Sequence, residues 1–393
     1  MSISAKTITA GDDYTLSRWT ADHVAAISTQ PMPSAPLIGS VQALPLLPKA
    51  DLWDLWPVQN ADGSVAEIAN GTLWMVLSAP CLDDPNMRHN VARTRLLHHC
   101  GNTWQDCGLL FPDDLNPGSR EWSGSARYDV GSNTVVAYFT AAGQRGEMVP
   151  SFEQRLFQTS GHLDLSGQHP VIVGWNDPEE LVLNDGTLYA SSVRTKGESG
   201  NIIGFRDPYW FCDSLDGCEY ILFTGSLPGS SYECSGVIGI ARANCGNSKT
   251  AFSLMSPIVS ADGVANEMER LHMLKRDGLY YLFWSTQHRM FSSNGPKGPT
   301  GLYGMVGPSI TGPFKPLNGT GLVIANPPEE PRQAYCWQVL DTLDVVSFVD
   351  HWGLMGRDVL TDPVLNRTHF GGTIAPMLKI EINGATTKLL GLA

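Results

Sequence analysis

The sequence predicts an all-β fold. Short runs rich in β-branched and aromatic residues recur from one end of the chain to the other, and Asp-Gly and Asn-Gly turn signals lie between them. Helical periodicity is confined to short pieces such as Thr20–Ile27, where Thr20 can cap the first turn. The runs that we expect to form strands are Thr72–Leu77, Thr134–Thr140, Leu188–Val193, Glu219–Thr224, Leu279–Trp284, Leu302–Val306 and Val345–Val349.

The chain shows no internal boundary. No Pro/Gly/Ser linker or charge run divides it, so we expect one domain over residues 1–393, with residues 1–45 as an N-terminal extension whose short helix packs on the rest. Radial repetition of small antiparallel sheets extends an all-β chain without exposing sheet edges, and it gathers distant residues at one axial funnel. This favours a β-propeller. Because no fixed-period repeat is evident, sandwich and barrel folds stay open on periodicity alone.

The composition excludes some partners. The chain has 26 basic and 39 acidic side chains, a formal charge of −13, which repels phosphate, so we expect no nucleic-acid partner and no binding to an anionic membrane. No apolar run approaches the roughly 20 residues of a membrane span. Residues 1–30 show no basic stretch followed by an apolar core. We therefore expect a cytoplasmic protein or one secreted by a leaderless route.

The cysteines favour neither a zinc site nor an obvious disulfide framework. The eight cysteines contain no C-x-x-C pair, and we expect reduced thiols, no metal and no cofactor. Pairs close enough in sequence to bridge are Cys100/Cys107, Cys212/Cys218 and Cys234/Cys245.

The first of three acidic segments centres on Asp54. Strand alternation would put Trp53 and Leu55 on one face and Asp54 and Trp56 on the other, so that a carboxylate points into aromatic surroundings. Pro57 would end or edge the strand. We interpret Asp54 as a candidate nucleophile at a strand end; an Asp that only caps a turn is the alternative.

The second segment is Arg206-Asp207-Pro208. The guanidinium beside Asp207 should hold the pKa of that carboxyl low, and Pro208 keeps the chain extended, so Asp207 can accept hydrogen bonds from sugar hydroxyls as an anion. A buried structural ion pair is the alternative reading of the same three residues.

The third segment is Glu267-Met268-Glu269-Arg270. Period-2 geometry places both Glu side chains on one face, where mutual repulsion raises the pKa of one of them and makes a proton donor. A solvated charged segment is the alternative. Glu233 is a rival acid, but it has no adjacent base to tune it.

Three further candidates lie outside these segments. Trp122 and Ser123 supply an aromatic face and a hydroxyl at a turn. His288 has two readings, as a ligand for a sugar hydroxyl or as a residue that caps a strand.

Taken in order, these segments resemble glycoside hydrolase family 68, which contains levansucrases, inulosucrases and bacterial β-fructofuranosidases. The likeness rests on W-D-x-W-P followed by V-Q-N-A-D-G, then W-S-G-S, F-R-D-P and E-x-E-R, which span Trp53 to Arg270 in the family's order. It extends more loosely through Tyr280–Arg289 and Tyr335. The resemblance implies a single catalytic domain, a five-bladed β-propeller with a central, funnel-shaped acidic pocket.

The resemblance also assigns roles. Asp54 matches the nucleophile, Glu269 the general acid/base and Asp207 the residue that stabilises the transition state. The implied substrate is sucrose, and fructose passes through a covalent fructosyl-enzyme to water or to fructooligosaccharide acceptors. The substrate-binding residues implied or suggested are Trp53, Trp122, Ser123, Arg206, Glu267, Arg270, His288 and Tyr335.

Departures from the family pattern narrow this interpretation. Asn266 stands where many members have an Asp that helps bind calcium, so we expect no required metal. Residues 286–289 differ in a region that shapes acceptor binding, which leaves polymer synthesis open. An invertase-like or arabinan-type hydrolase of a related propeller family and a non-catalytic sugar-binding propeller are the alternative functions. The linkage formed and the oligomeric state have no signal in the sequence.

Overall fold

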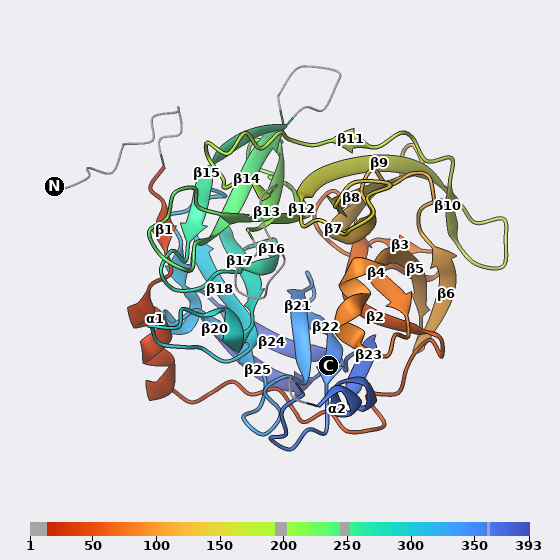
Figure 1. Cartoon of the computed structure of the whole chain (residues 1–393). Coiled ribbons are helices and arrows are strands. Elements are labelled where there is room, and N and C mark those ends of the chain that lie inside the picture. The colour runs from red at the N-terminus through yellow and green to blue at the C-terminus, as the bar shows by residue number, and fades with distance from the viewer. Residues whose placement is uncertain (1–13, 193–202, 244–251, 360–361) are drawn as a thin grey trace.

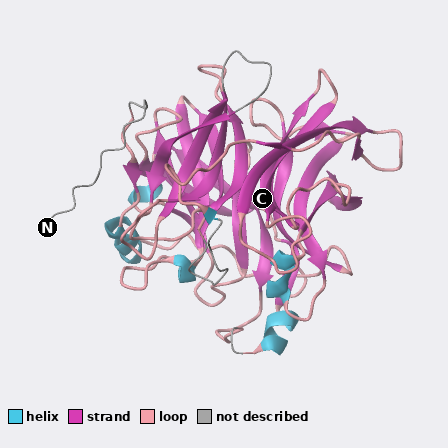
Figure 2. Ribbon diagram, turned by 45° about the horizontal axis from the view of Figure 1, so that its top comes forward, coloured by secondary structure: helices cyan, strands magenta, loops and turns pink. Residues whose placement is uncertain are grey.

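The protein is built almost entirely from antiparallel sheet, as expected. The computed structural model describes residues 14–192, 203–243, 252–359 and 362–393, and Figures 1 and 2 show strands throughout this part of the chain. Six of the predicted runs lie inside strands. The exception is Leu188–Ser192, which forms no strand, while Val193 lies outside the described residues.

The first two sheets differ in size. One has the strand order β1 (Ser17–Arg18), β15 (Phe252–Ser260), β14 (Gly236–Ala243), β13 (Glu219–Ser226) and β12 (Phe205–Cys212). The larger sheet has the order β10 (Val171–Val173), β9 (Gln154–Asp164), β8 (Thr134–Ala142), β7 (Arg120–Asp129), β2 (Ala50–Gln59), β4 (Gly71–Pro80), β5 (Arg93–Cys100) and β6 (Thr103–Leu109), with β11 (Glu179–Glu180) and β3 (Glu67–Ile68) beside β9 and β4.

The two remaining sheets come from the C-terminal part of the chain. One contains β16 (Glu269–Arg276), β17 (Leu279–Thr286), β18 (Gly301–Gly307), β19 (Lys315–Pro316) and β20 (Leu322–Ala325). The other contains β21 (Ala334–Val339), β22 (Asp344–His351), β23 (Phe370–Ile374), β24 (Leu378–Asn383) and β25 (Thr386–Leu392).

The sheets are arranged around one centre (Figure 1). In the described part of the chain, β2, β7, β12, β16 and β21 contact one another in turn, and β21 returns to β2, so these strands form a nearly closed, barrel-like ring. Among the described ring strands, only β2 and β7 form a backbone ladder with each other, through the parallel pairs Val58↔Ala126 and Gln59↔Arg127. Most residues of the ring strands are buried, because each sheet packs against its neighbours on both faces.

Each ring strand carries an irregularity near the centre. The pairing register shifts at Trp53/Leu55, Trp122/Gly124, Arg206/Tyr209, Glu269/His272 and Tyr335/Gln338. Non-glycine residues with positive φ sit at four of these bulges, namely Asp54 (39°), Asp207 (61°), Arg270 (53°) and Cys336 (56°). A bulge adds a residue and re-aims its side chain. The alternation expected around Asp54 is therefore wrong: neighbouring side chains, rather than every second one, face the centre.

The N-terminal segment lies across the sheets. Thr20 caps α1 (Ala21–Ala25), as expected, and its backbone N–H donates to Nδ1 of His23 at 3.0 Å; η1 (Ala26–Thr29) follows directly. Trp19 is buried and donates from Nε1 to the carbonyl oxygen of Thr320 at 2.8 Å. The described residues also contain the short helices η2 (Pro85–Asn90), η4 (His288–Met290), η5 (Leu317–Gly319) and α2 (Pro363–Thr368).

The predictions about cysteine thiols and membrane spans can be compared with the described residues. Free thiols occur at Cys81, Cys100, Cys107, Cys212, Cys234 and Cys336, so these cysteines are reduced as expected and the alternative Cys100/Cys107 bridge is absent. Cys245 lies outside the described residues. None of the helices in residues 14–192, 203–243, 252–359 and 362–393 has the length and apolarity needed to cross a bilayer.

The run Leu188–Ser192 fails as a strand because tertiary contacts replace sheet pairing. Tyr189 is fully buried, and its hydroxyl donates to the carbonyl oxygen of Met255 at 2.6 Å. Ala190 donates one backbone hydrogen bond to Ser226. The β-propensity of this run instead fills a hydrophobic cluster with Phe205 and Phe223.

Candidate active site

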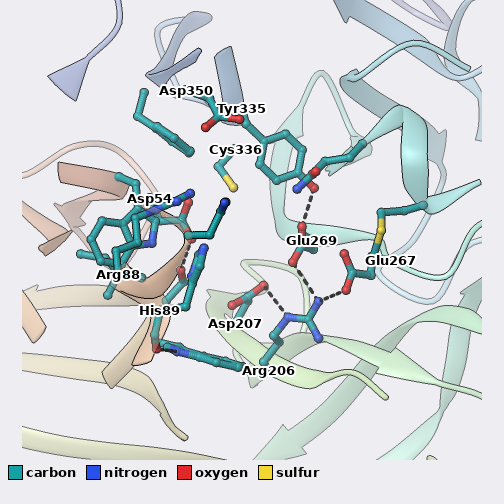
Figure 3. Close-up of a pocket in the computed structure, with 18 of the residues that line it drawn as sticks. Asp54, Arg88, His89, Arg206, Asp207, Glu267, Glu269, Tyr335, Cys336 and Asp350 are labelled. Carbon is teal, nitrogen blue, oxygen red and sulfur yellow. Dashed lines mark hydrogen bonds and ion pairs between the residues drawn. The ribbon is translucent and has the colours of Figure 1, made fainter. Parts of the chain in front are cut away.

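A cavity of about 390 Å³ opens at the centre of the ring. All five ring strands contribute to its lining, together with η2, the segment around η4 and the end of β22. Figure 3 shows the acidic side chains converging on it from different strands. The lining includes Trp53, Asp54, Arg88, His89, Trp122, Ser123, Arg206, Asp207, Glu267, Glu269, Gln287, Arg289, Arg332, Tyr335, Cys336 and Asp350.

Asp54 is held in place by a hydroxyl from the next ring strand. Oγ of Ser123 donates to Oδ2 of Asp54 at 2.6 Å. Gly124 follows Ser123 at the bulge of β7, and a Cβ there would lie 1.8 Å from the carbonyl oxygen of Tyr138. A glycine is therefore required for Ser123 to reach Asp54, which explains the W-S-G-S pattern in physical terms.

Two tryptophans wall the cavity beside Asp54. Trp53 lies edge-on to the His89 ring, with 5.7 Å between ring centroids, and the Arg88 guanidinium lies 5.4 Å from its ring centroid. Trp122 donates from Nε1 to the carbonyl oxygen of His89 at 3.1 Å. The η2 segment thus fixes both aromatic faces, which are suited to packing on a sugar ring.

Arg206 is shared by three carboxylates. Its Nη2 lies 2.9 Å from Oε1 of Glu267 and 2.8 Å from Oε1 of Glu269, and its Nε lies 3.9 Å from Oδ2 of Asp207. Burial by itself lowers the pKa of Arg206, but these carboxylates raise it by more, so the guanidinium stays charged. One buried cation therefore offsets the repulsion among three acids.

Asp207 does not keep the low pKa that its neighbour Arg206 led us to expect. Burial raises the pKa of Asp207 to about 6, although Arg206 and Arg270 act in the opposite direction. Its Oδ2 accepts a hydrogen bond from the backbone N–H of Arg270 at 3.3 Å and lies 3.4 Å from Oγ1 of Thr224. Desolvation outweighs the ion pair because the side chain is almost entirely enclosed.

Glu267 and Glu269 both face the cavity, as period-2 geometry predicts. Burial and the charge of Glu269 raise the pKa of Glu267 to about 7, so the expected upward shift within the pair is present. Oε2 of Glu269 accepts a hydrogen bond from the hydroxyl of Tyr335. The Glu269 side chain is 17% exposed against 5% for Glu267, which makes Glu269 the more accessible to a ligand. A solvated charged segment is excluded.

The comparisons with known proteins identify the family of the chain. A family model described as Levansucrase/Invertase matches residues 9–232 and 228–390 of the chain. The chain belongs to glycoside hydrolase family 68.

The relatives cover most of the chain. A levansucrase of Zymomonas mobilis is 32% identical over 364 residues, which make up 85% of this chain and 80% of that protein. An extracellular sucrase of the same organism is 29% identical over 367 residues, covering 86% of this chain and 84% of that protein. Among solved structures, an inulosucrase from Halalkalicoccus jeotgali bound to kestose superimposes with a TM-score of 0.87 at 32% identity and covers 96% of both chains.

Two of the predicted substrate-binding residues, Arg270 and His288, do not line the cavity. The Arg270 side chain donates to the carbonyl oxygens of Gly124 at 3.0 Å and Leu55 at 3.2 Å and lies over the Trp56 ring, so it fastens ring strands together. His288 lies in the turn of η4, where Nδ1 contacts the carbonyl oxygen of Gly298 at 2.8 Å, and it faces a second cavity. Its neighbours Gln287 and Arg289 line the first.

The rival acid Glu233 is not part of the site. Its side chain is exposed and accepts a hydrogen bond from Ser293 at 2.7 Å. No residue of the segment 232–234 lines the central cavity. The other predicted substrate-binding residues all line the cavity with the three candidate catalytic acids, namely Trp53, Trp122, Ser123, Arg206, Glu267 and Tyr335.

Several residues that line the cavity were not predicted from the sequence to belong to the site. Arg88 and His89 belong to η2, whose start is signalled by the capping Asp84 followed by Pro85, although that signal does not indicate a site. Cys336 follows Tyr335 at a bulge that the sequence does not reveal. Asp350 stands at the end of an apolar strand with no motif around it. Their position depends on contacts between distant segments.

A metal has no evident place in the described part of the chain, where no three His, Cys, Asp or Glu side chains group in a way that could hold an ion. The expectation that family 68 chemistry here needs no metal stays a prediction.

The raised pKa of Glu267 predicts how stability depends on pH. The folded state binds the proton of Glu267 more tightly than the unfolded chain, where the pKa is 4.5, so this group stabilises the fold below about pH 4.5 and the contribution is lost as the pH rises through about 7. The midpoint of urea unfolding should fall over this range in the wild type and fall less in Glu267→Gln. Parallel pH curves for the two proteins would contradict the prediction.

Proposed function

We propose that this chain is a sucrose-acting, retaining β-fructosyl-transferring enzyme that passes fructose to water or to sugar acceptors. The observation that carries the proposal is the meeting of Asp54, Asp207 and Glu269 in one cavity walled by Trp53 and Trp122. The sequence relatives include a levansucrase and an extracellular sucrase, and the solved structure with 32% identity is an inulosucrase bound to kestose. These three names have transfer or hydrolysis at a fructosyl unit in common.

We propose, further, that the whole chain forms one catalytic five-bladed β-propeller. Support comes from the ring strands β2, β7, β12, β16 and β21, each of which begins a separate run of antiparallel neighbours. The ten-stranded sheet counts as two blades because only two residue pairs join its halves at β2 and β7. The described part of the N-terminal extension, residues 14–45, packs on this propeller through α1 and η1.

In the first chemical step, Glu269 gives its proton to the oxygen that joins the glucosyl and fructosyl units of sucrose. The bond from that oxygen to the anomeric C2 of fructose breaks with its electron pair on the oxygen, and an oxygen of Asp54 bonds to C2. Glucose leaves, and fructose stays as an ester of Asp54. Ser123 holds Asp54 in line for this attack through the 2.6 Å hydrogen bond.

Asp207 and Arg206 assist both steps electrostatically. Positive charge develops on the fructosyl ring in the transition state, and an ionised Asp207 stabilises it while accepting hydrogen bonds from ring hydroxyls. Arg206 and Tyr335 bind the two different oxygens of Glu269 and so fix the orientation of the acid.

In the second step Glu269 acts as a base and Asp54 as the leaving group. Water or a sugar hydroxyl gives its proton to Glu269 and attacks C2, and the bond to Asp54 breaks, which restores both carboxyl groups. Attack by water yields fructose, whereas attack by sucrose or a fructooligosaccharide yields a longer product. No metal or cofactor takes part in this scheme.

Incubation of the purified protein with sucrose tests the proposal. We expect release of glucose, with free fructose equal to glucose if water is the acceptor and lower than glucose if fructose is transferred to sugar. The Asp54→Asn protein under the same conditions is the control for background hydrolysis. Absence of glucose above that background would overturn the proposed function.

A further inference from the structure

Asp350 is an acid of the cavity that the proposed chemistry does not use. It lies in β22 and lines the same cavity as the three candidate catalytic acids. Figure 3 places it beside Tyr335 and Cys336, on the side of the cavity away from Arg206. Its side chain is 20% exposed, so it can meet a ligand.

The charges around Asp350 keep it ionised. Burial by itself raises the pKa of Asp350, but His351, Arg88 and Arg332 lower it by more, to well below the usual range. These groups come from three segments, namely β22 itself, η2 and the loop before β21. Nδ1 of His351 lies 3.0 Å from Oδ1 of Asp350. The carboxylate is therefore present as an acceptor of hydrogen bonds at any ordinary pH.

A series of polar contacts fixes the His351 ring on the side opposite to Asp350. Nε2 of His351 lies 2.8 Å from Oδ1 of Asn366, and Nδ2 of Asn366 donates to Oδ1 of Asp84 at 2.9 Å. Because the carboxylate of Asp84 only accepts, the amide oxygen of Asn366 must face His351, so Nε2 carries a hydrogen. The other ring nitrogen, Nδ1, faces the carboxylate of Asp350 at 3.0 Å. His351 is therefore held between Asn366 and Asp350.

The same contacts connect Asp350 to the tryptophans. Asp84 caps η2 by accepting from the backbone N–H of Asn86 at 2.9 Å. The η2 segment carries His89, which contacts Trp53 and accepts from Trp122. One wall of the cavity, from Asp350 to the tryptophans, is thus held as a unit by Asn366 of α2.

The other acids of the cavity are already engaged. Asp54 accepts from Ser123, Glu269 from Arg206 and Tyr335, and Glu267 pairs with Arg206. Asp350 has a single basic neighbour within 4 Å among the described residues, which is Nδ1 of His351 at 3.0 Å from Oδ1. Asp350 therefore has lone pairs available for the hydroxyls of a bound sugar.

We propose that Asp350 determines which sugar binds beside the fructosyl unit, by accepting hydrogen bonds from hydroxyls of the leaving glucosyl unit and of the incoming acceptor, and that His351 and Asn366 position it. The inference rests on the proposed function. Since a retaining enzyme removes the leaving group and admits the acceptor on the same face of C2, one residue can contact both. Asp350 is a specificity residue, and the chemical steps stay with Asp54, Asp207 and Glu269.

The first test is Asp350→Asn, which keeps the shape and removes the charge. We expect the KM for sucrose to rise about tenfold, as for loss of a hydrogen bond to a charged group, and the transferred fraction of fructose to fall severalfold, while kcat changes less than about threefold. Asp114→Asn, on an exposed Asp outside the cavity, is the control. Wild-type glucose release reports separately on the proposed function. A KM and a transferred fraction equal to those of the wild type would overturn the inference.

The second test is a pH series with His351→Gln. Because His351 lowers the pKa of Asp350, that pKa should rise without it. The KM and transferred fraction of His351→Gln should therefore resemble those of the wild type near pH 7 and approach those of Asp350→Asn near pH 4.5. The KM and the transferred fraction of each variant are divided by those of the wild type at the same pH, because the other acids of the cavity titrate in every variant. A purely structural role for His351 would change the transferred fraction equally at both pH values, and that outcome would refute the positioning role.

Discussion

Replacing Asp54 by Asn is expected to lower sucrose turnover by several orders of magnitude, on the order of 10⁴ to 10⁶, as for loss of other enzymatic nucleophiles. Glu269→Gln should cost roughly 10² to 10⁴, the usual contribution of a general acid/base. Both substitutions keep the side-chain volume, so thermal unfolding should stay close to that of the wild type. The measurement is kcat for glucose release, with melting temperatures recorded for each protein.

A change of leaving group separates the two roles. β-Fructosyl fluoride releases fluoride, which needs little protonation, so Glu269→Gln should recover much of the first step on this substrate. Asp54→Asn should not recover, because it lacks the atom that attacks C2. Glu233→Gln is the matched control, since Glu233 is an exposed Glu outside the cavity. An equal loss of sucrose turnover in Glu233→Gln would mean that the acid has been wrongly assigned.

The sequence contains enough information to predict the site's acids but not their local geometry. Asp54, Asp207 and Glu269 could be identified because each lies in a short motif with a chemical reason for its composition. Strand alternation around Asp54 failed because a bulge with φ of 39° occurs at a non-glycine residue, where no local signal marks it. Likewise, Asp207 next to Arg206 suggests a low pKa, and only the packed fold shows that burial outweighs the cation.

Residues positioned by long-range contacts could not be predicted. Asp350 reaches the cavity because β22 lies next to the ring strand β21, and its state depends on His351 and on Arg88 of η2. His288 was a reasonable candidate, yet the short helical turn of η4 directs it away and leaves Gln287 and Arg289 in the lining. The sequence placed acceptor binding near residue 288, whereas the proposed role of Asp350 places it at a wall that pattern reasoning does not reveal.

Arg206→Gln is expected to damage both stability and catalysis. The substitution leaves Glu267, Glu269 and Asp207 without their shared cation, and removal of one partner from a buried ion pair typically costs about 3–5 kcal/mol. Because Arg206 lowers the pKa of Glu267 and Asp207, both pKa values should rise further. Turnover should fall on the order of 10² to 10³, as for loss of one electrostatic stabiliser. Urea unfolding and the pH profile of kcat/KM measure the two effects.

A double substitution distinguishes loss of charge balance from loss of packing. If the cost of Arg206→Gln comes from carboxylates left without a cation, adding Glu267→Gln removes one of those charges and should restore part of the free energy of unfolding, so the two changes are not additive. Turnover should not return, since Glu269 still lacks the guanidinium that orients it. Arg206→Lys keeps the charge but not the two-pronged geometry, so it should retain stability better than activity. Additive effects of Arg206→Gln and Glu267→Gln on stability would show that Arg206 acts by filling space, and the shared-cation explanation would then fail.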